Sequence, residues 1–199
     1  MTTPKLSTMF ILLAATAAYG ILPPAQTGEL YVGNYDGDNV LVYDGAGNYL
    51  RSFTAAGLNG PRGVVMGPDG RIYVASQISS EIYIFDANEQ LVDTFAHAQL
   101  SALTGMAFSA GGLLYISSYN NDRVCVFTPG GVFVRSFTGL GLDGTNCVAF
   151  DSAGSLYVSS AISAEILKFD ASENYLFSFT GGGLSSPMSI ARNSADTLY

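Results

Sequence analysis

The side chains that enzyme chemistry most often uses are few in this sequence and poorly spaced for it. The chain has one histidine, His97, whereas a catalytic zinc site needs several converging ligands. The acidic run Asp36-Gly37-Asp38-Asn39 has oxygen ligands of the kind that calcium prefers, but its spacing is too short for a complete cage. We interpret this run as a turn with solvated acids, and His97 as a solvent-exposed loop residue. No Gly-x-Ser-x-Gly or phosphate-loop motif occurs, so we predict no catalytic residue, no metal and no cofactor.

The elements that would position a functional residue follow an internal repeat. The repeat stays in step from Gly28 onward, without insertion or deletion. It is marked by three sets of residues, each recurring at one constant step: Tyr31, Tyr73, Tyr115, Tyr157 and Tyr199; Phe53, Phe95, Phe137 and Phe179; Leu58, Leu100, Leu142 and Leu184. A period near 42 with four strand-like runs in each unit is typical of a β-propeller blade. We therefore predict an all-β fold, a β-propeller of four-stranded antiparallel blades, with about four 42-residue repeats in this chain.

Each repeat consists of short apolar runs separated by turns. In the second repeat the runs are Ile72–Val74, Ile82–Phe85 and Leu91–Val92, which are too short for helices and rich in β-branched and aromatic residues. Strict alternation of apolar and polar residues is missing, as expected for sheets that are covered on both faces. One turn position carries a glycine in every unit, where we expect a positive φ: Gly28, Gly70, Gly112 and Gly154.

The segment 1–25 does not belong to the repeat. Met9–Ala18 is an apolar segment of signal-peptide length, and Ala15-Thr16-Ala17 offers a small-residue cleavage site. We favour a cleaved export signal, which would make the protein secreted or extracytoplasmic. The alternative is an uncleaved membrane anchor, because the apolar stretch Leu6–Leu22 just reaches the minimum length of a spanning helix. The expected organisation is 1–25 as signal peptide or anchor and 28–199 as propeller repeats.

The repeats at the two ends are incomplete. The inner strand of the first unit would fall at Ile21–Pro24, which lacks the expected pattern, and the tail begins a further unit with Met188–Arg192 as its first strand. This tail could pair with the first unit and close a four-blade ring. However, propellers avoid open sheet edges, so we expect a piece of a longer ring. Alternate units are more alike, as Arg51 and Arg135 illustrate, so we expect an even blade number such as six.

The two cysteines, Cys125 and Cys147, fall on non-adjacent strand positions of neighbouring repeats. An exported chain would permit a disulfide. However, a bridge is forbidden where the Cα atoms lie more than about 7 Å apart, which we expect at these positions. The cysteines also lack the spacing of a metal motif. We predict two buried free thiols.

Candidate binding residues lie in the connections that differ most between repeats. In a four-stranded blade, the connection between the second and third strands shares one rim with the connection to the next blade. The ligand-binding candidates on this rim are Tyr35, Asp36, Asp38, Asn59, Arg62, Asn120, Asp122, Arg123 and Asn146. The alternative is that these residues are merely tolerated variation.

The segments PRGV (61–64), PDGRIYVA (68–75) and IYIFD (82–86) together closely resemble the NHL repeat, and the resemblance extends over residues 28–199. The family often carries Asp after the Tyr-Val-Ala run and Asn-Arg before the third strand. Here the first position is Asn34, Ser76, Ser118 or Ser160, and the arginine survives only as Arg123. NHL-type propellers serve as protein-binding platforms, RNA readers, sensor ectodomains and, in a few branches, metal-dependent lyases or lactonases. The resemblance therefore implies the fold and leaves the function open.

Composition and connection lengths limit the classes of function that fit this chain. The net charge is −8 and the pI about 4.3, so the chain lacks the basic footprint that binds nucleic acid. Every connection has the same length in each unit, so no extra loop is available to build a pocket. We predict an exported, non-catalytic binding or scaffold module whose partner is a protein, peptide or glycan. A membrane would be contacted only through an uncleaved N-terminal segment.

Two other functions stay open. The chain could be a fragment of a propeller hydrolase or lyase, lactonase-like or amidating-lyase-like, whose catalytic residues lie in further blades. It could also be the ectodomain of a membrane-anchored sensor, which an uncleaved leader would support.

Overall fold

Short antiparallel strands are the main regular element in a computed structural model that describes residues 28–193 and 195–199. The strands of the first two sheets are β1 (Leu30–Asn34), β2 (Asn39–Tyr43) and β3 (Tyr49–Phe53), followed by β4 (Pro61–Met66), β5 (Ile72–Ser76), β6 (Glu81–Phe85) and β7 (Leu91–Ala96). The third and fourth sheets contain β8 (Leu103–Phe108), β9 (Leu114–Ser118), β10 (Arg123–Phe127) and β11 (Phe133–Thr138), then β12 (Thr145–Phe150), β13 (Leu156–Ser160), β14 (Glu165–Phe169) and β15 (Tyr175–Phe179). Two 3₁₀ turns, η1 (Tyr35–Gly37) and η2 (Tyr119–Asn121), complete the described elements.

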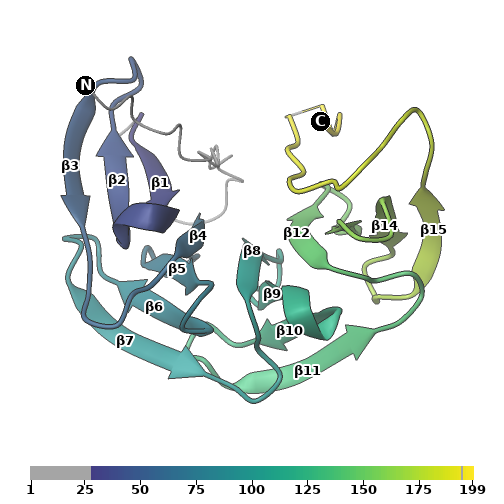
Figure 1. Cartoon of the computed structure of the whole chain (residues 1–199), viewed down its shortest axis with the longest axis horizontal. Coiled ribbons are helices and arrows are strands. Elements are labelled where there is room, and N and C mark those ends of the chain that lie inside the picture. Colours follow the sequence, from purple (N-terminus) through teal and green to yellow (C-terminus); the bar gives the residue numbers. More distant parts are fainter. Residues whose placement is uncertain (1–27, 194) are drawn as a thin grey trace, which may run out of the picture.

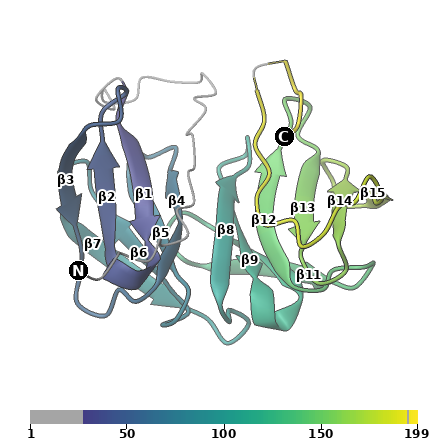
Figure 2. The same ribbon diagram turned by 45° about the horizontal axis from the view of Figure 1, so that its top comes forward.

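The four sheets follow one another around an open arc (Figure 1). Within each sheet the strands pair in chain order and antiparallel. The first strand of each complete sheet lies toward the centre of the arc and the last strand on its circumference; Figure 2 shows the sheets standing side by side. The predicted β-propeller of four-stranded blades is therefore confirmed, with three complete blades and a three-stranded first sheet among the described residues.

Turn chemistry separates the strands as the sequence predicts. Gly70 and its equivalents have positive φ, which is +76° at Gly70 and +78° at Gly112. After the third strand, Asp86 Oδ1 accepts hydrogen bonds from the backbone N–H groups of Asn88 and Gln90, both at 2.9 Å. A short polar side chain of this kind stabilises a turn by replacing backbone partners.

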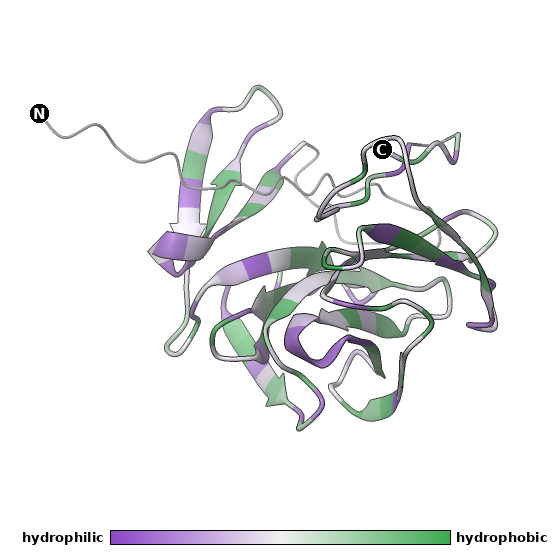
Figure 3. Cartoon of the chain, turned by 45° about the vertical axis from the view of Figure 1, so that its right-hand side comes forward, coloured by the Kyte–Doolittle hydropathy of each residue, from purple (hydrophilic) through white to green (hydrophobic). Residues whose placement is uncertain are grey.

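The core lies between the sheets rather than inside any one of them. The second strands of the complete blades, β5, β9 and β13, are buried along their whole length. Neighbouring sheets cover both faces of β5 and β9, whereas one face of β13 is covered by the segment that contains Ile190 and Leu198. Aromatic rings join successive sheets at matching positions: Phe53 to Phe85, Phe95 to Phe127 and Phe137 to Phe169, with ring centroids 4.9, 5.1 and 5.3 Å apart. Figure 3 shows apolar residues concentrated along the strands and polar residues mostly in the connections.

The innermost strands of adjacent sheets approach backbone to backbone. A Cβ atom added at Gly63 would lie 2.4 Å from the Thr104 carbonyl oxygen, and one added at Gly105 would lie 2.7 Å from the Asn146 carbonyl oxygen. Only glycine permits such an approach. Cys147 occupies the next equivalent position, and its Sγ faces the Ile190 carbonyl oxygen at 3.9 Å.

Both cysteines are buried free thiols, as predicted. Burial raises the pKa of the Cys125 thiol to about 11. The Cys147 thiol is buried more deeply and its pKa is raised for the same reason. Neither thiol is therefore activated as a nucleophile at neutral pH.

The segments at the two ends differ from the complete blades. The inner strand considered at Ile21–Pro24 and the signal or anchor at 1–25 lie outside the described residues. The strand predicted at Met188–Arg192 is wrong: the segment forms one isolated bridge, between Arg192 and Leu198. The reason is that only a short stretch pairs with it, through the backbones of Ala191 and Tyr199. No helix among residues 28–193 and 195–199 is long and apolar enough to cross a membrane.

Candidate functional site

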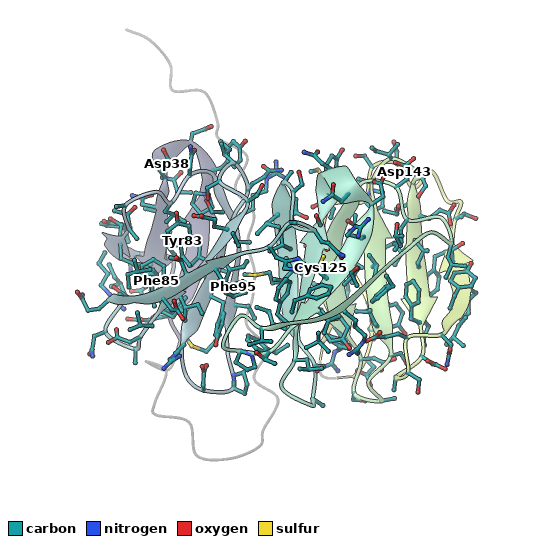
Figure 4. The ribbon with its side chains drawn as sticks, turned by 90° about the horizontal axis from the view of Figure 1, so that it is seen from below. Asp38, Tyr83, Phe85, Phe95, Cys125 and Asp143 are labelled. Atoms are coloured by element: carbon teal, nitrogen blue, oxygen red, sulfur yellow. The ribbon has the colours of Figure 1, made fainter. Side chains whose placement is uncertain are left out.

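The connections predicted to share one rim are hydrogen-bonded to one another. The backbone N–H of Gln77, between β5 and β6, donates to the Gly60 carbonyl oxygen at 3.0 Å, and that of Ile78 donates to the Asn59 carbonyl oxygen at 3.1 Å. The pattern repeats one and two units later. We define the rim as residues 34–39, 54–62, 76–81, 97–104, 118–123, 138–146 and 160–165. Figure 4 shows Asp38 and Asp143, two sheets apart, on the same edge of the molecule.

Buried serines at the strand ends form hydrogen bonds with the backbone of the rim connections. Ser76 Oγ accepts a hydrogen bond from the Asn59 N–H at 2.9 Å and donates to the Asn59 carbonyl oxygen at 2.7 Å. Ser118 and Ser160 bind the two following connections in the same way. These serines stand where the NHL pattern often has Asp. Because each serine satisfies both backbone groups away from water, the rim is held as a fixed platform.

The first cluster of candidate residues surrounds Gly60. A Cβ atom there would lie 2.8 Å from Tyr35 Cε2 and 3.0 Å from Ile78 Cγ1, so the glycine lies between the two side chains. Its φ is +65°, and its N–H donates to Asp38 Oδ1 at 2.8 Å. The Arg62 guanidinium lies 5.3 Å from the centroid of the Tyr35 ring, within reach of a cation–π interaction.

The same arrangement recurs two repeats later, around Gly144. Its Cβ would lie 2.8 Å from Ile162 Cγ1 and 3.2 Å from Tyr119 Cε2. Its φ is +68°, and its N–H donates to Asp122 Oδ1 at 2.7 Å. The intervening connection instead has an alanine at the glycine position, Ala102. The alternation seen in the sequence therefore has a counterpart in the geometry of the rim.

The predicted residues fall into two groups, one at each glycine. The first group contains Tyr35, Asp36, Asp38, Asn59 and Arg62, and the second contains Asp122 and Asn146. Asn120 belongs to the intervening connection, because its Nδ2 donates to Ser101 Oγ at 3.3 Å. Arg123 joins neither group, because its Nη1 donates to Gln99 Oε1 at 3.1 Å and its Nε to the Asn121 carbonyl oxygen at 3.3 Å. The acidic run at 36–39 contains two exposed acids, although Asp38 also accepts the hydrogen bond from Gly60.

Asn146 is buried, unlike the other rim amides. Its side chain is only 4% exposed, and its Nδ2 has no hydrogen-bond partner among the described residues. It stands at the rim end of β12, next to Thr145, whose Oγ1 donates to the carbonyl oxygens of Ser118 and Arg123 at 2.9 and 3.0 Å. A buried amide donor without a partner is costly, and an ordered internal water would satisfy it.

The most exposed apolar residues of the two clusters are not among the binding residues predicted from the sequence. Ile78 and Ile162 are 56% and 60% exposed, although each packs beside a glycine and a tyrosine. The second tyrosine, Tyr119, is also missing from that prediction. A signal was present, because an isoleucine recurs in alternate polar loops, Ser76-Gln77-Ile78 and Ser160-Ala161-Ile162. Exposed apolar groups in such loops point to an interaction surface.

The histidine stands apart from the two glycine clusters. The His97 ring stacks on Phe133 with centroids 4.3 Å apart and an interplanar angle of 7°, and it meets Phe127 edge-on at 5.7 Å. The expectation of a solvent-exposed loop residue is therefore wrong, since the ring is half-buried. Its flat apolar surface covers aromatic rings of β10 and β11. Among the described residues, no group of three or more His, Cys, Asp or Glu side chains is placed to hold a metal ion.

Charged pairs are concentrated on the opposite face, where the turns at 28–29, 44–48, 67–71, 86–90, 128–132, 151–155 and 170–174 lie. There Arg51 joins two sheets, with Nη1 2.7 Å from Glu29 Oε1 and Nη2 2.6 Å from Glu89 Oε1. The equivalent pair is Arg135 with Glu173. The Tyr115 hydroxyl accepts a hydrogen bond from Arg135 and donates one to Glu173. These pairs connect successive sheets.

The paired carboxylates predict acid sensitivity. Hydrogen bonds from Arg51 lower the pKa of Glu29 below 4.5. Burial alone would raise the pKa of Glu173, but hydrogen bonds from Arg135 and Tyr115 outweigh it, and the pKa is lowered. Because the folded pKa lies below the unfolded value, this stabilisation is present above about pH 4.5 and is lost as the pH falls through the folded pKa.

We expect the free energy of unfolding to fall more steeply between about pH 5 and pH 3 in the wild-type protein than in the R51M/R135M variant. Urea unfolding at several pH values would measure the difference. Parallel curves for the two proteins would contradict the role of these pairs. The turn aspartates are unchanged in the variant, so their contribution to the pH dependence is the same in both proteins.

Comparisons with known proteins define the class of fold. A catalytically inactive histidine-to-alanine variant of virginiamycin B lyase from Staphylococcus aureus, solved with quinupristin, superposes with a TM-score of 0.73 at 14% identity, over 87% of this chain and 59% of that chain. A streptogramin B lyase gives 0.74 at 14% identity, over 96% and 64%. A protein of unknown function from Bacteroides caccae gives 0.65 at 13% identity, over 85% and 65%.

These similarities and the four sheets make the protein a β-propeller. The chain spans less than two thirds of the length of each of these structures. No family model matches the sequence, and no curated protein matches it. The NHL resemblance therefore stays a prediction.

Proposed function

We propose that this propeller is an exported, non-catalytic module that binds a protein or peptide on its rim. The observation that carries the proposal is the pair of matching surfaces around Gly60 and Gly144, where an exposed isoleucine and a tyrosine stand beside polar groups. Apolar side chains rimmed by polar ones are typical of protein–protein contacts. The hydrogen bonds from the buried serines to the rim backbone also support the proposal, because a rigid surface loses little conformational entropy on binding.

A peptide or protein fits this surface better than the other partners considered. Ile78 and Ile162 offer aliphatic surface, which matches apolar side chains, whereas a glycan presents mainly hydroxyl groups. Nucleic acid is disfavoured by the net charge of −8. Export itself rests on the leader at 1–25 and would be tested by the mass of the secreted protein.

A second candidate is a propeller lyase, favoured by the similarity to the two lyase structures. One of these was made catalytically inactive by replacing a histidine. In this chain the one histidine, His97, stacks on Phe133 at the side of the third sheet, away from the two glycine clusters. That position disfavours a histidine-dependent reaction at the two glycine clusters.

Two experiments on the purified chain, a peptide selection and an assay for lyase activity, separate the two functions. The purified chain would be used to select binders from a displayed random-peptide library, and the selected peptides would be tested on the Y35A/Y119A variant. Val132→Ser is the matched control, because Val132 is 65% exposed in a turn on the opposite face. We expect peptides that bind wild type and V132S equally and bind Y35A/Y119A at least about tenfold more weakly.

The opposite outcomes are equally definite. Failure to enrich any peptide, or equal binding to all three proteins, would contradict a peptide-binding rim. The purified chain would also be incubated with quinupristin and analysed by mass spectrometry. Enzyme-dependent conversion that follows the protein through purification would contradict the non-catalytic assignment and establish a lyase.

A further inference from the structure

We infer that the rim carries two equivalent subsites for the apolar side chains of a cationic peptide. The first subsite is Tyr35, Gly60 and Ile78, and the second is Tyr119, Gly144 and Ile162. This inference rests on the proposed function and adds to it the number of subsites and the chemistry of the ligand.

The geometry of each subsite favours a ligand side chain. The glycine brings a tyrosine and an isoleucine together from two different sheets, within van der Waals distance of its own backbone. Position 60 has φ +65° and position 144 has φ +68°, so each connection turns sharply at the glycine. The isoleucine remains more than half exposed. A ligand methyl or methylene group resting on the isoleucine would remove apolar surface from water without displacing protein atoms.

The number of subsites follows from the repeat. The positions that correspond to Tyr35, Gly60 and Ile78 in the next unit are Gln77, Ala102 and Asn120. Neither an aromatic nor an aliphatic side chain of the required size stands there. The arrangement returns only in the unit after that, so the two subsites belong to alternate sheets. A ligand with two apolar side chains, or two separate ligand segments, would fill them.

The charge of the rim selects a cationic ligand. Its acidic residues are Asp36, Asp38, Glu81, Asp122, Asp143 and Glu165, and its basic residues are Arg62 and Arg123. On the opposite face acids also outnumber bases, but the bases Arg51, Arg71, Arg135 and Lys168 are held there in ion pairs with acids. The excess of carboxylates on the rim attracts positive charge and would accelerate association with a basic peptide.

The two subsites differ at four polar positions. Asp36, Asn39, Asn59 and Arg62 around the first subsite correspond to Asn120, Arg123, Asp143 and Asn146 around the second. Each set contains one acid and one base, so the substitutions leave the net charge of the two subsites equal. A cationic peptide should therefore bind the two subsites with similar affinity.

Isoleucine methyl groups provide a direct measurement of both subsites. The full chain, labelled with ¹³C at isoleucine δ1, would be titrated with the blocked peptide acetyl-Lys-Leu-Lys-amide. We expect saturable shifts of the Ile78 and Ile162 methyl signals, with similar affinities, and no shift at the buried Ile82 and Ile116. Raising the salt to about 0.5 M should weaken binding several-fold, because the charges are exposed.

Two control peptides and two variants decide the outcome. Acetyl-Lys-Ser-Lys-amide lacks the apolar group and acetyl-Glu-Leu-Glu-amide reverses the charge, so each should bind at least about tenfold more weakly. Ile162→Ser should abolish the second subsite and leave the Ile78 shifts intact, while Val132→Ser on the opposite face should change neither. Both substituted positions are exposed, so the variants should fold.

Shifts at only one isoleucine, or equal shifts with all three peptides, would overturn this inference. The proposed function would survive that result if peptides selected from the library still lost affinity for Y35A/Y119A. Conversely, the absence of any rim binder in the selection, together with flat titrations, would overturn both. The two failures are therefore distinguishable.

Discussion

Replacing Phe127 by alanine should lower the free energy of unfolding by about 3–5 kcal/mol, the range found for truncating buried aromatic residues. Phe127 is fully buried on β10, with ring centroids 5.1 Å from Phe95, 5.5 Å from Phe133 and 5.7 Å from His97. Its loss would remove apolar burial and open a cavity at the contact between the second and third sheets. In repeat proteins each unit is stabilised mainly by its neighbours, so the damage should be greatest at that contact.

Urea unfolding followed by tyrosine fluorescence measures this effect, since the chain contains no tryptophan and 12 tyrosines. Phe179→Ala is the matched control, because Phe179 is 42% exposed on β15. It should cost less than about 1 kcal/mol, as expected for a largely exposed position. If F127A does not fold, the more conservative change Phe127→Leu should still cost about 1.5 kcal/mol. Equal destabilisation by F127A and F179A would show that contact between sheets does not dominate stability.

Replacing Gly63 by alanine should destabilise the protein by about 1–3 kcal/mol, toward the upper end because the clash is with backbone. The added Cβ would lie 2.4 Å from the Thr104 carbonyl oxygen, on the innermost strand of the next sheet. A backbone atom cannot rotate away as a side chain does. The two inner strands would have to separate, and this would loosen the rim connections attached to their ends.

The repeat supplies a control at the equivalent position, Cys147. Cys147→Ala retains a Cβ that the structure already accommodates, because the nearest chain there is the segment around Ile190 rather than a paired inner strand. We expect a loss of only about 1 kcal/mol from the missing sulfur. The same unfolding experiment compares G63A with C147A. A G63A variant as stable as wild type would contradict the close backbone approach.

The fold was largely predictable because its determinants are local and repeated. The turn glycines, such as Gly70 and Gly112, and the short strand runs specify each blade through residues close together in sequence. Two local predictions failed where the surroundings decided the outcome. Met188–Arg192 has the pattern of a strand but too short a partner, and His97 has the composition of a loop but stacks on Phe133.

The candidate site was only partly predictable, because packing between sheets creates it. Sequence alone showed that Tyr35, Asp36 and Arg62 share a rim with Asn146. It did not show that Ile78 meets Tyr35 across Gly60, since those residues come from two sheets and touch only after the sheets pack. Nor did it show that Asn146 is buried with an unsatisfied amide, or that Arg51 forms its ion pairs on the opposite face.

The amino-acid sequence by itself therefore determined the blade, its period and its turns, because these depend on interactions within a few residues. Only the tertiary structure decided which rim residues stand together and which acids and bases form ion pairs. Those properties depend on how one sheet is placed against the next, and the repeat pattern alone does not specify that contact at the level of side chains.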